Sequence, residues 1–287
     1  MMKKILKLIW DEFIYGGHLT ALGAPSIAYL AARFSNQEFP IVLGVLLYTG
    51  AESIYLFDRI NDLDKDENSN CERATHLRQK KTARMTFAVA FITVTIALPI
   101  VEKKYLFTCI LLFMLFLGLL YSTYFKNLSS RITGFKNIFV SSMWMLTPIL
   151  YLLYIYPDKV FRPGFYIAIA FIFLRELINP TFCDIKDMHS DKQLGIRTIA
   201  NQLGKDQTIS FLRIINLLSA LPLMIGFMFN IIPAKYLILI ILLIYTEYYL
   251  LYARKKMPIH SYVYTVIPDV EIVSYFLLLS VVTMHGL

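Results

Sequence analysis

PGFYIAIAFIFLRELINPTFC, residues 163–183, is a mostly apolar run that is long enough to cross a membrane as one helix. The acidic stretch DIKDMHSDKQLGIRT, residues 184–198, follows it without a break. A second stretch of the same kind, DRINDLDKD at 58–66, follows another apolar run at 38–57. The sequence therefore predicts two groups of carboxylates at the points where membrane helices leave the bilayer.

The composition indicates a polytopic membrane protein and excludes a soluble domain. The chain has 287 residues, a mean hydropathy of +0.58 and only 17% charged residues, and long apolar runs recur along it. The net charge of +8 is better explained by Lys and Arg in short loops beside membrane helices than by a nucleic-acid partner, which we do not expect. The lipid bilayer is the expected partner of the whole chain.

Apolar runs of membrane-spanning length, about 20 residues, divide the chain into nine candidate helices. Their expected ranges are 17–34, 38–57, 85–101, 105–125, 135–156, 163–183, 209–229, 232–252 and 263–285. The predicted fold class is therefore all-α, in a single transmembrane domain over residues 1–287. Acidic loops follow the second and sixth runs and basic loops the fourth and eighth, which suggests a pseudo-repeat of 17–125 and 135–252 plus a final helix at 263–285.

Lys and Arg residues are distributed unevenly among the predicted loops. Most of them lie before the first span and in the loops after even-numbered spans, whereas the other loops carry few. Cytoplasmic loops of membrane proteins carry such an excess of basic residues. The sequence therefore predicts an integral multi-pass protein with its N-terminus and both acidic stretches on the cytoplasmic side, and its C-terminus outside.

The acids in both stretches have helical spacing. Asp58, Asp62 and Asp66 are four residues apart, so a continued helix would place their carboxylates on one face. The second stretch has three acids at spacings of three and four: Asp184, Asp187 and Asp191. Like charges on one face are destabilising unless a positive group lies against them, and grouped carboxylates are the ligands that Mg²⁺ prefers. The two clusters suggest a shared metal site.

The second stretch and the residues after it resemble a signature of the UbiA superfamily of intramembrane prenyltransferases. That signature is Asp-x-x-Asp-x-x-x-Asp with a Gly, a Thr and a later Gly, and its positions here are Asp184, Asp187, Asp191, Gly195, Thr198 and Gly204. The family's first signature, Asn-Asp-x-x-Asp-x-x-x-Asp, is matched at its last two acids by Asp58 and Asp62. Ile54 and Tyr55 stand where the family has Asn-Asp.

The resemblance implies helices around a central chamber, in which a polyprenyl diphosphate donor loses its diphosphate and a lipophilic or aromatic acceptor captures the allylic cation. It implies Mg²⁺ as cofactor, with ligands Asp58, Asp62, Asp184, Asp187 and Asp191. The acids expected to be catalytic are Asp58, Asp62, Asp187 and Asp191. The residues expected to bind substrate are Arg73, Lys126, Lys136 and Tyr121. A diphosphate is hard and multiply charged, and therefore matches carboxylate-held Mg²⁺ and basic side chains.

Two other functions remain open at this point. The same superfamily includes intramembrane terpene cyclases, in which a double bond of the prenyl chain itself captures the cation. The altered first signature and the lack of an evident acceptor-activating base favour this alternative. A cation transporter would also use intramembrane carboxylates, but it would place them near the bilayer midplane rather than at helix ends. Neither the prenyl chain length nor the acceptor follows from the sequence.

Overall fold

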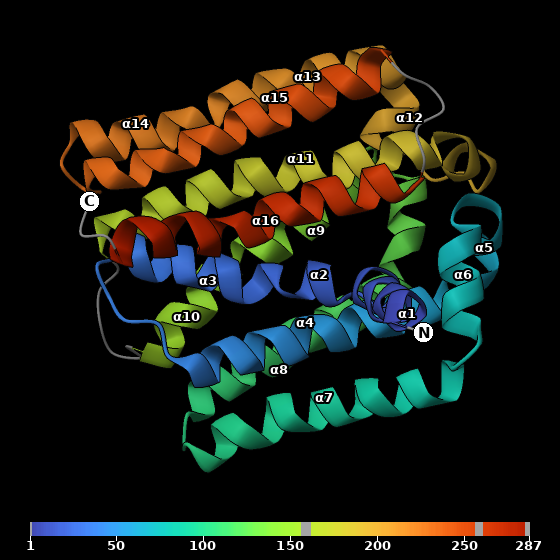
Figure 1. The fold of residues 1–287 in the computed structure, drawn as a ribbon, viewed down its shortest axis with the longest axis horizontal. Helices are drawn as coiled ribbons and strands as arrows, with labels where there is room; N and C mark the ends of the chain where they lie inside the picture. Colours follow the sequence, from blue (N-terminus) through green and yellow to red (C-terminus); the bar gives the residue numbers. More distant parts are fainter. Residues whose placement is uncertain (1, 156–161, 256–260, 285–287) are drawn as a thin grey trace.

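The computed structural model describes residues 2–155, 162–255 and 261–284, and the regular elements within these ranges are all helical (Figure 1). The first part of the chain forms α1 (Met2–Tyr15), α2 (His18–Ala21), α3 (Gly23–Phe34), α4 (Ile41–Asn61), α5 (Leu63–Ser69), α6 (Cys71–Arg78), α7 (Lys81–Val101), α8 (Tyr105–Thr123) and the 3₁₀ helix η1 (Phe125–Ser130). The second part forms α9 (Phe135–Met145), α10 (Thr147–Ile155), α11 (Pro163–Gln193), α12 (Ile199–Leu203), α13 (Lys205–Leu218), α14 (Ala220–Met228), the 3₁₀ helix η2 (Ala234–Leu239), α15 (Ile240–Lys255) and α16 (Ser261–Met284).

Seven helical segments of the described chain are long and apolar enough to cross a membrane. They are Ile41–Asn61, Lys81–Val101, Phe135–Ile155, Pro163–Gln193, Lys205–Met228, Ala234–Lys255 and Val266–Met284. The apolar part of α8, Tyr105–Tyr121, is shorter, and the expected span 17–34 consists of α2 and α3, which join at Leu22. The all-helical membrane fold is therefore confirmed, whereas the count of nine is not.

The acid-bearing segments gather at one end of the helix bundle. In Figure 1, α5, α6 and α12 lie at the end where α11 finishes, and α1 is seen almost end-on beside them while the long helices run across the view. Helix α11 continues ten residues beyond its expected end at 183 and reaches Gln193. The second group of acids therefore lies on the helix itself and shares its rigid backbone.

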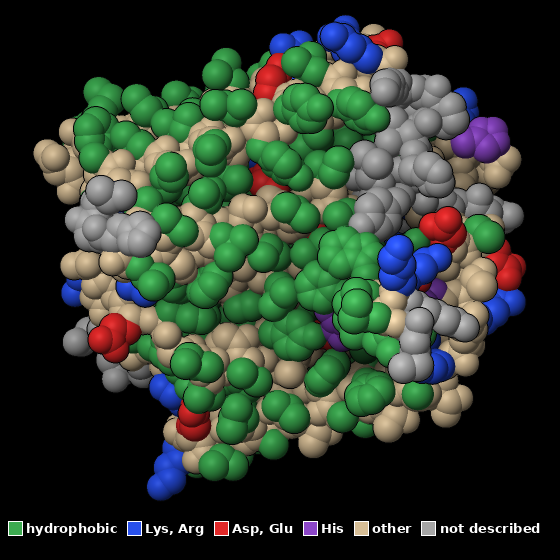
Figure 2. All heavy atoms as spheres, in the orientation of Figure 1, with side chains coloured by type: hydrophobic (Ala, Val, Ile, Leu, Met, Phe, Trp, Pro, Cys, Tyr) green, Lys and Arg blue, Asp and Glu red, His purple; other side chains and the backbone are tan. Residues whose placement is uncertain are grey.

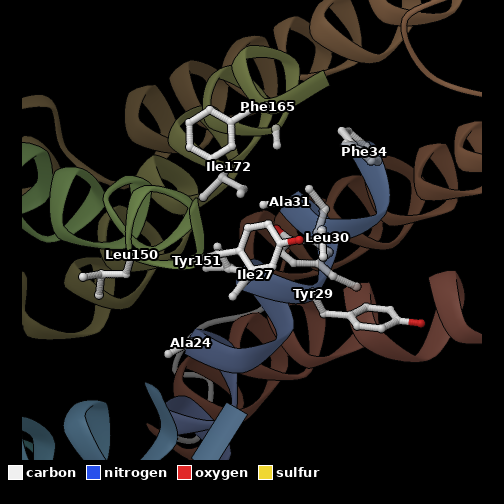
Figure 3. Packing of buried hydrophobic residues seen from close by; sticks show 14 of the residues in the cluster. Ala24, Ile27, Tyr29, Leu30, Ala31, Phe34, Leu150, Tyr151, Phe165 and Ile172 are labelled. Carbon is white, nitrogen blue, oxygen red and sulfur yellow. The ribbon is translucent and has the colours of Figure 1, made fainter. Parts of the chain in front are cut away.

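Hydrophobic side chains from helices that include α3, α10 and α11 fill the interior at the opposite end of the bundle. Figure 3 shows Ile27 of α3 beside Tyr151 of α10, and Ile172 and Phe165 of α11 nearby; all four are fully buried. Helices α3 and α11 approach closely at Gly164, where an added Cβ would lie only 1.9 Å from the carbonyl oxygen of Phe34. On the outer surface, hydrophobic side chains cover most of the face in Figure 2, while charged ones gather mainly toward its ends, as expected for a lipid-facing surface.

Two helix-interior prolines create polar links between neighbouring helices. A proline cannot donate the backbone hydrogen bond to the carbonyl four residues earlier. In α11, Pro180 frees the carbonyl of Glu176, which accepts a 2.8 Å hydrogen bond from the Ser141 hydroxyl of α9. In α16, Pro268 frees the carbonyl of Tyr264, which accepts from the Cys183 thiol of α11 at 3.0 Å. Both freed groups thus have partners, and α11 is tied to α9 and α16.

Candidate active site

A single cavity of about 360 Å³ joins the acidic end of the bundle to its apolar interior. Its polar wall includes Asp58, Asp62, Arg73, Lys136, Asp184 and Asp187. Its apolar wall includes Ala24, Leu47, Leu111, Met114, Leu115 and Leu150. These side chains come from helices far apart in the sequence, so the cavity forms only when both halves of the chain pack together. Its chemistry suits a ligand with a charged head and a hydrocarbon tail.

Asp184 is held by two donors from the start of α9. Lys136 Nζ donates to one carboxylate oxygen at 2.5 Å and Asn137 Nδ2 donates to the other at 2.8 Å. Asp184 and Asn137 are fully buried, whereas Lys136 is partly exposed and lines the cavity. Asp184 therefore fixes the ammonium group of Lys136 at the cavity wall and balances its charge.

A second group of contacts joins α5 and α6 to α11. Arg73 donates from Nε and Nη2 to the two carboxylate oxygens of Asp66, at 2.8 and 2.6 Å. Asn70 donates to Asp66 at 3.3 Å and accepts from Lys186 Nζ of α11 at 2.8 Å. Lys186 lies 3.4 Å from the carboxylate of its neighbour Asp187. Burial alone would lower the pKa of Arg73, but the charge and hydrogen bonds of Asp66 outweigh it and raise this pKa, so the guanidinium stays charged.

Three polar atoms at the cavity wall, one of them Ser129 Oγ, are buried and lack a hydrogen-bond partner among the described residues, and the other two belong to residues expected at the site. They are Asp187 Oδ1 and the hydroxyl of Tyr121, whose ring is stacked on Phe139 with a centroid distance of 4.8 Å. A buried polar atom without a partner is costly, unless a ligand supplies the missing contact. Both atoms therefore point to a polar or charged ligand in the cavity.

The carboxylates at the cavity fit Mg²⁺ only together with a ligand that brings further oxygens. No three Asp, Glu, His or Cys side chains in the described part of the chain converge closely enough to hold a metal ion among themselves. Magnesium in phosphate sites is commonly bound by one or two carboxylates, with substrate phosphates and water completing the octahedron. Asp58 and Asp62 of the first stretch and Asp187 of the second line the same cavity and can supply one or two ligands from each side.

The structure brings together seven of the side chains expected at the site. Asp58, Asp62, Arg73, Tyr121, Lys136, Asp184 and Asp187 all line the cavity. Asp191 is fully buried and is not among the lining residues. The backbone of Lys126 belongs to η1, but its side chain lies outside the described residues.

Replacement of the first signature's Asn-Asp changes the character of one wall. Ile54 and Tyr55 both line the cavity, and Ile54 packs against Gly118 of α8, where an added Cβ would lie 2.7 Å from its Cδ1. Asp66, one helical turn after the second matched acid, lines the cavity too, whereas Asp64 is 96% exposed and pairs with Arg78. Asp66 is therefore a third acid of the first stretch at the cavity, although both of its oxygens accept from Arg73.

Several polar residues of the cavity wall were not predicted from the signatures, among them Lys186, Asn179 and Asp269. Lys186 and Asn179 lie on the same helix as the second signature, and Asp269 lies on α16. The detectable signal was an ionisable residue inside an apolar span, which is costly in a membrane and usually functional. Asp269 has that property, because it stands in the apolar run 263–285.

Comparisons with a family model and with solved structures agree with the helical membrane fold. The model of the UbiA prenyltransferase family matches residues 19–264. The chain belongs to the UbiA prenyltransferase family. A UbiA homologue from Aeropyrum pernix K1, solved in its apo form, is similar in structure with a TM-score of 0.68 at 13% identity, covering 91% of this chain and 98% of that one. A structure of digeranylgeranylglyceryl phosphate synthase in membranes has a TM-score of 0.55 at 19% identity, covering 99% and 98%. No curated protein sequence matches the chain.

The UbiA fold and the family membership support an intramembrane prenyltransferase. At these identities the two solved structures establish the fold alone. Seven apolar helices and the family assignment make this UbiA protein an integral multi-pass membrane protein.

Proposed function

We propose that this UbiA protein is a Mg²⁺-dependent prenyltransferase that moves a polyprenyl group from its diphosphate to an aromatic or lipid acceptor. The observation that carries the proposal is the cavity itself, in which acids and bases at one end continue into an apolar chamber. A prenyl diphosphate has the same division, since its head is highly charged and its tail is hydrocarbon. The diphosphate would lie at the polar wall and the tail among the apolar helices.

The basic side chains at the polar wall are arranged to hold the diphosphate. Arg73, Lys136 and Lys186 line the cavity and each already contacts a carboxylate or amide, which limits their freedom before substrate binds. Charge-assisted hydrogen bonds from such groups to phosphate oxygens are strong. The free hydroxyl of Tyr121 can donate to a phosphate oxygen as well. These groups would hold the leaving group in place while the allylic C–O bond breaks.

The acids would bind the metal from both halves of the chain. Asp58 and Asp62 would act from α4 and its end, and Asp187, with an unpartnered Oδ1, from α11. Asp184 would act through Lys136, because both of its oxygens accept hydrogen bonds from α9, and Asp191 is fully buried on the same helix. Mg²⁺ held by these carboxylates would supply the positive charge that offsets the charge developing on the departing diphosphate.

Terpene cyclisation is a second candidate, and the altered first signature favours it. Tyr55 and Trp144 line the cavity with ring centroids 6.3 Å apart, and aromatic faces stabilise cations. In a cyclase, an internal double bond of the same chain would capture the cation, and no second substrate would be needed.

One incubation separates the two candidates. The purified protein in nanodiscs is supplied with Mg²⁺ and geranyl, farnesyl or geranylgeranyl diphosphate without an acceptor, and products are extracted for mass spectrometry. A cyclic hydrocarbon or terpene alcohol, lost in Asp58→Ala and Asp187→Ala, would identify a cyclase. Slow hydrolysis that needs Mg²⁺, stops with EDTA and is replaced by a prenylated product once an acceptor is added supports transfer. Absence of any diphosphate release would rule out both.

A further inference from the structure

A second polar cluster lies in the cavity wall, formed by side chains of α2, α11 and α16. Asp269 of α16 accepts a hydrogen bond of 2.5 Å from the Thr20 hydroxyl of α2 and one of 3.3 Å from Asn179 Nδ2 of α11. All three residues line the cavity. Asp269 is only 5% exposed, so it is a carboxylate enclosed within the protein and open to the chamber.

The contacts of Asp269 leave much of its hydrogen-bonding capacity unused. A carboxylate can accept about four hydrogen bonds, and the described structure supplies two, both from uncharged donors. No described Lys, Arg or His forms an ion pair with it. Arg59 does not donate to Asp269: its guanidinium donates to the carbonyls of Ile14 and Tyr15 and to the Thr20 hydroxyl at 3.3 Å, and its charge acts on Asp269 through space. Asp269 therefore has room for a further donor from the chamber.

Other buried acids of the bundle lack this combination. Glu271 is occupied by Arg175, Thr246 and Tyr249, and neither it nor Glu176 lines the cavity. Asp184 accepts hydrogen bonds from Lys136 and Asn137, and its charge is already balanced by the Lys136 ammonium group. Among the described acids outside the stretches 58–66 and 184–198, Asp269 is thus the one that lines the cavity.

The hydrogen bond to Asn179 of α11 places Asp269 deeper in the chamber than Asp187 of the second signature. Its partner Asn179 lies eight residues before Asp187, which corresponds to about 12 Å along a helix. A diphosphate held at the mouth presents its allylic carbon toward the interior, because the tail extends that way. A group that attacks this carbon from the side opposite the diphosphate must come from the deeper part of the chamber, where Asp269 lies.

We propose that Asp269 is a catalytic residue that accepts the proton of a hydroxyl-bearing acceptor, with Thr20 and Asn179 as positioning residues. This inference rests on the proposed prenyl transfer. The allylic C–O bond breaks and its electron pair leaves with the diphosphate. A bond forms between the allylic carbon and the acceptor's hydroxyl oxygen, and the hydroxyl proton passes to the Asp269 carboxylate, which becomes a neutral acid. Charge and atoms balance without any further reactant.

The structure also explains how Asp269 is kept in place. The Cys183 thiol donates a hydrogen bond to the Tyr264 carbonyl, which Pro268 leaves free. The Tyr245 hydroxyl donates to the carbonyl of Ile267 at 2.9 Å. The turn of α16 just before Asp269 is thereby fixed to α11 and α15. A preorganised base loses little free energy in reorientation when the acceptor binds.

The test separates ionisation of the donor from capture of the cation. Geranylgeranyl and farnesyl diphosphates carry ¹⁸O in the bridging C–O–P position, so that reversible ionisation moves the label into non-bridging positions even without an acceptor. The full-length protein in nanodiscs receives Mg²⁺ and one of two probes, 4-hexylphenol or its methyl ether 4-hexylanisole, which lacks the hydroxyl proton. Isotope exchange, prenyl alcohol and prenylated probe are all quantified.

For Asp269→Asn we expect the isotope exchange to stay within about 2-fold of the parent, while prenylation of 4-hexylphenol falls by about 100-fold, the usual effect of losing a general base. The methyl ether should be unreactive with both proteins. The control is Glu176→Gln, the same chemical change at a buried acid outside the cavity, and it should alter neither rate.

Two results would overturn the assignment. If Asp269→Asn slows isotope exchange and capture equally, the residue supports the fold or the ionisation step and is not the proton acceptor. If the parent protein shows exchange but no phenol product, or if Asp269→Asn leaves capture unchanged, the chamber has no base at this position. Absence of exchange in the parent itself with either donor would instead overturn the proposed function, and this inference with it.

Discussion

Arg73 is the residue whose geometry is hardest to replace. Its two hydrogen bonds to Asp66 use the planar fork of a guanidinium, and the remaining N–H groups are available to the cavity. Lysine keeps the charge but not the fork. We expect Arg73→Lys to raise the KM for a prenyl diphosphate by about 10-fold, the loss of one charge-assisted hydrogen bond, with a smaller effect on kcat.

The matched control for this change is Arg78→Lys, since Arg78 is half exposed and pairs with Asp64 and Glu67 at the surface. Steady-state kinetics of diphosphate release measure both variants. Equal effects at the two positions would mean that Arg73 does not contact the donor.

At the scale of helices, the link between α9 and α11 is a testable consequence of Pro180. Ser141→Ala removes the donor to the Glu176 carbonyl, and a buried carbonyl without a partner should cost about 1–3 kcal/mol in the free energy of unfolding. Pro180→Ala restores a backbone N–H that can reach this carbonyl. In the double variant we therefore expect part of the lost stability to return.

Thermal unfolding in detergent, followed by circular dichroism, measures this cycle of single and double variants. Strictly additive effects would show that the hydroxyl and the proline do not compete for the same carbonyl.

Helix α1 is attached to the bundle by a set of ion pairs that responds to pH. Burial raises the pKa of Glu12, but Arg84 and His76 outweigh this effect and lower it below its ordinary value. The contribution of Glu12 to stability is therefore present above the ordinary pKa and is lost as the pH falls through the lowered one. We expect the environment of Trp10 on α1 to change, by fluorescence, between neutral pH and about pH 3. Glu12→Gln should show the low-pH spectrum at neutral pH; an unchanged spectrum would contradict this attachment.

At the scale of the whole molecule, the orientation predicted from the basic loops has a direct test. Cys71 is exposed on α6, at the acidic end, and Cys109 is exposed on the apolar helix α8. A membrane-impermeant maleimide should label Cys71 in inside-out vesicles and not in right-side-out vesicles, because that end is expected to face the cytoplasm. Cys109 should resist labelling in both, since its surroundings are lipid. The opposite pattern for Cys71 would reverse the topology.

Sequence patterns predicted the helical membrane fold and most of the polar wall, because both depend on local spacing. Four-residue spacing and apolar runs indicated where Asp58, Asp62 and Asp187 would lie. The role of Asp184 did not follow from spacing, because it depends on Lys136 and Asn137, which are nearly 50 residues away. The break between α2 and α3 was missed as well, since Leu22 continues the apolar run.

The place of Asp269 in the cavity wall also did not follow from sequence spacing. Its neighbours along the chain are apolar, and its two partners come from α2 and α11, 249 and 90 residues away. Only the three-dimensional fold brings these side chains to one cavity.

The contact between Asn70 and Lys186 also has a consequence for synthesis of the chain. These residues are 116 positions apart, so at translation rates of 5–20 residues per second Lys186 is made roughly 6–23 s after Asn70. During that interval α5 and α6 have no partner on α11. The segment around α5 and α6 should therefore be most open to proteases in nascent chains arrested before α11 is made. It should become resistant only when α11 has been inserted.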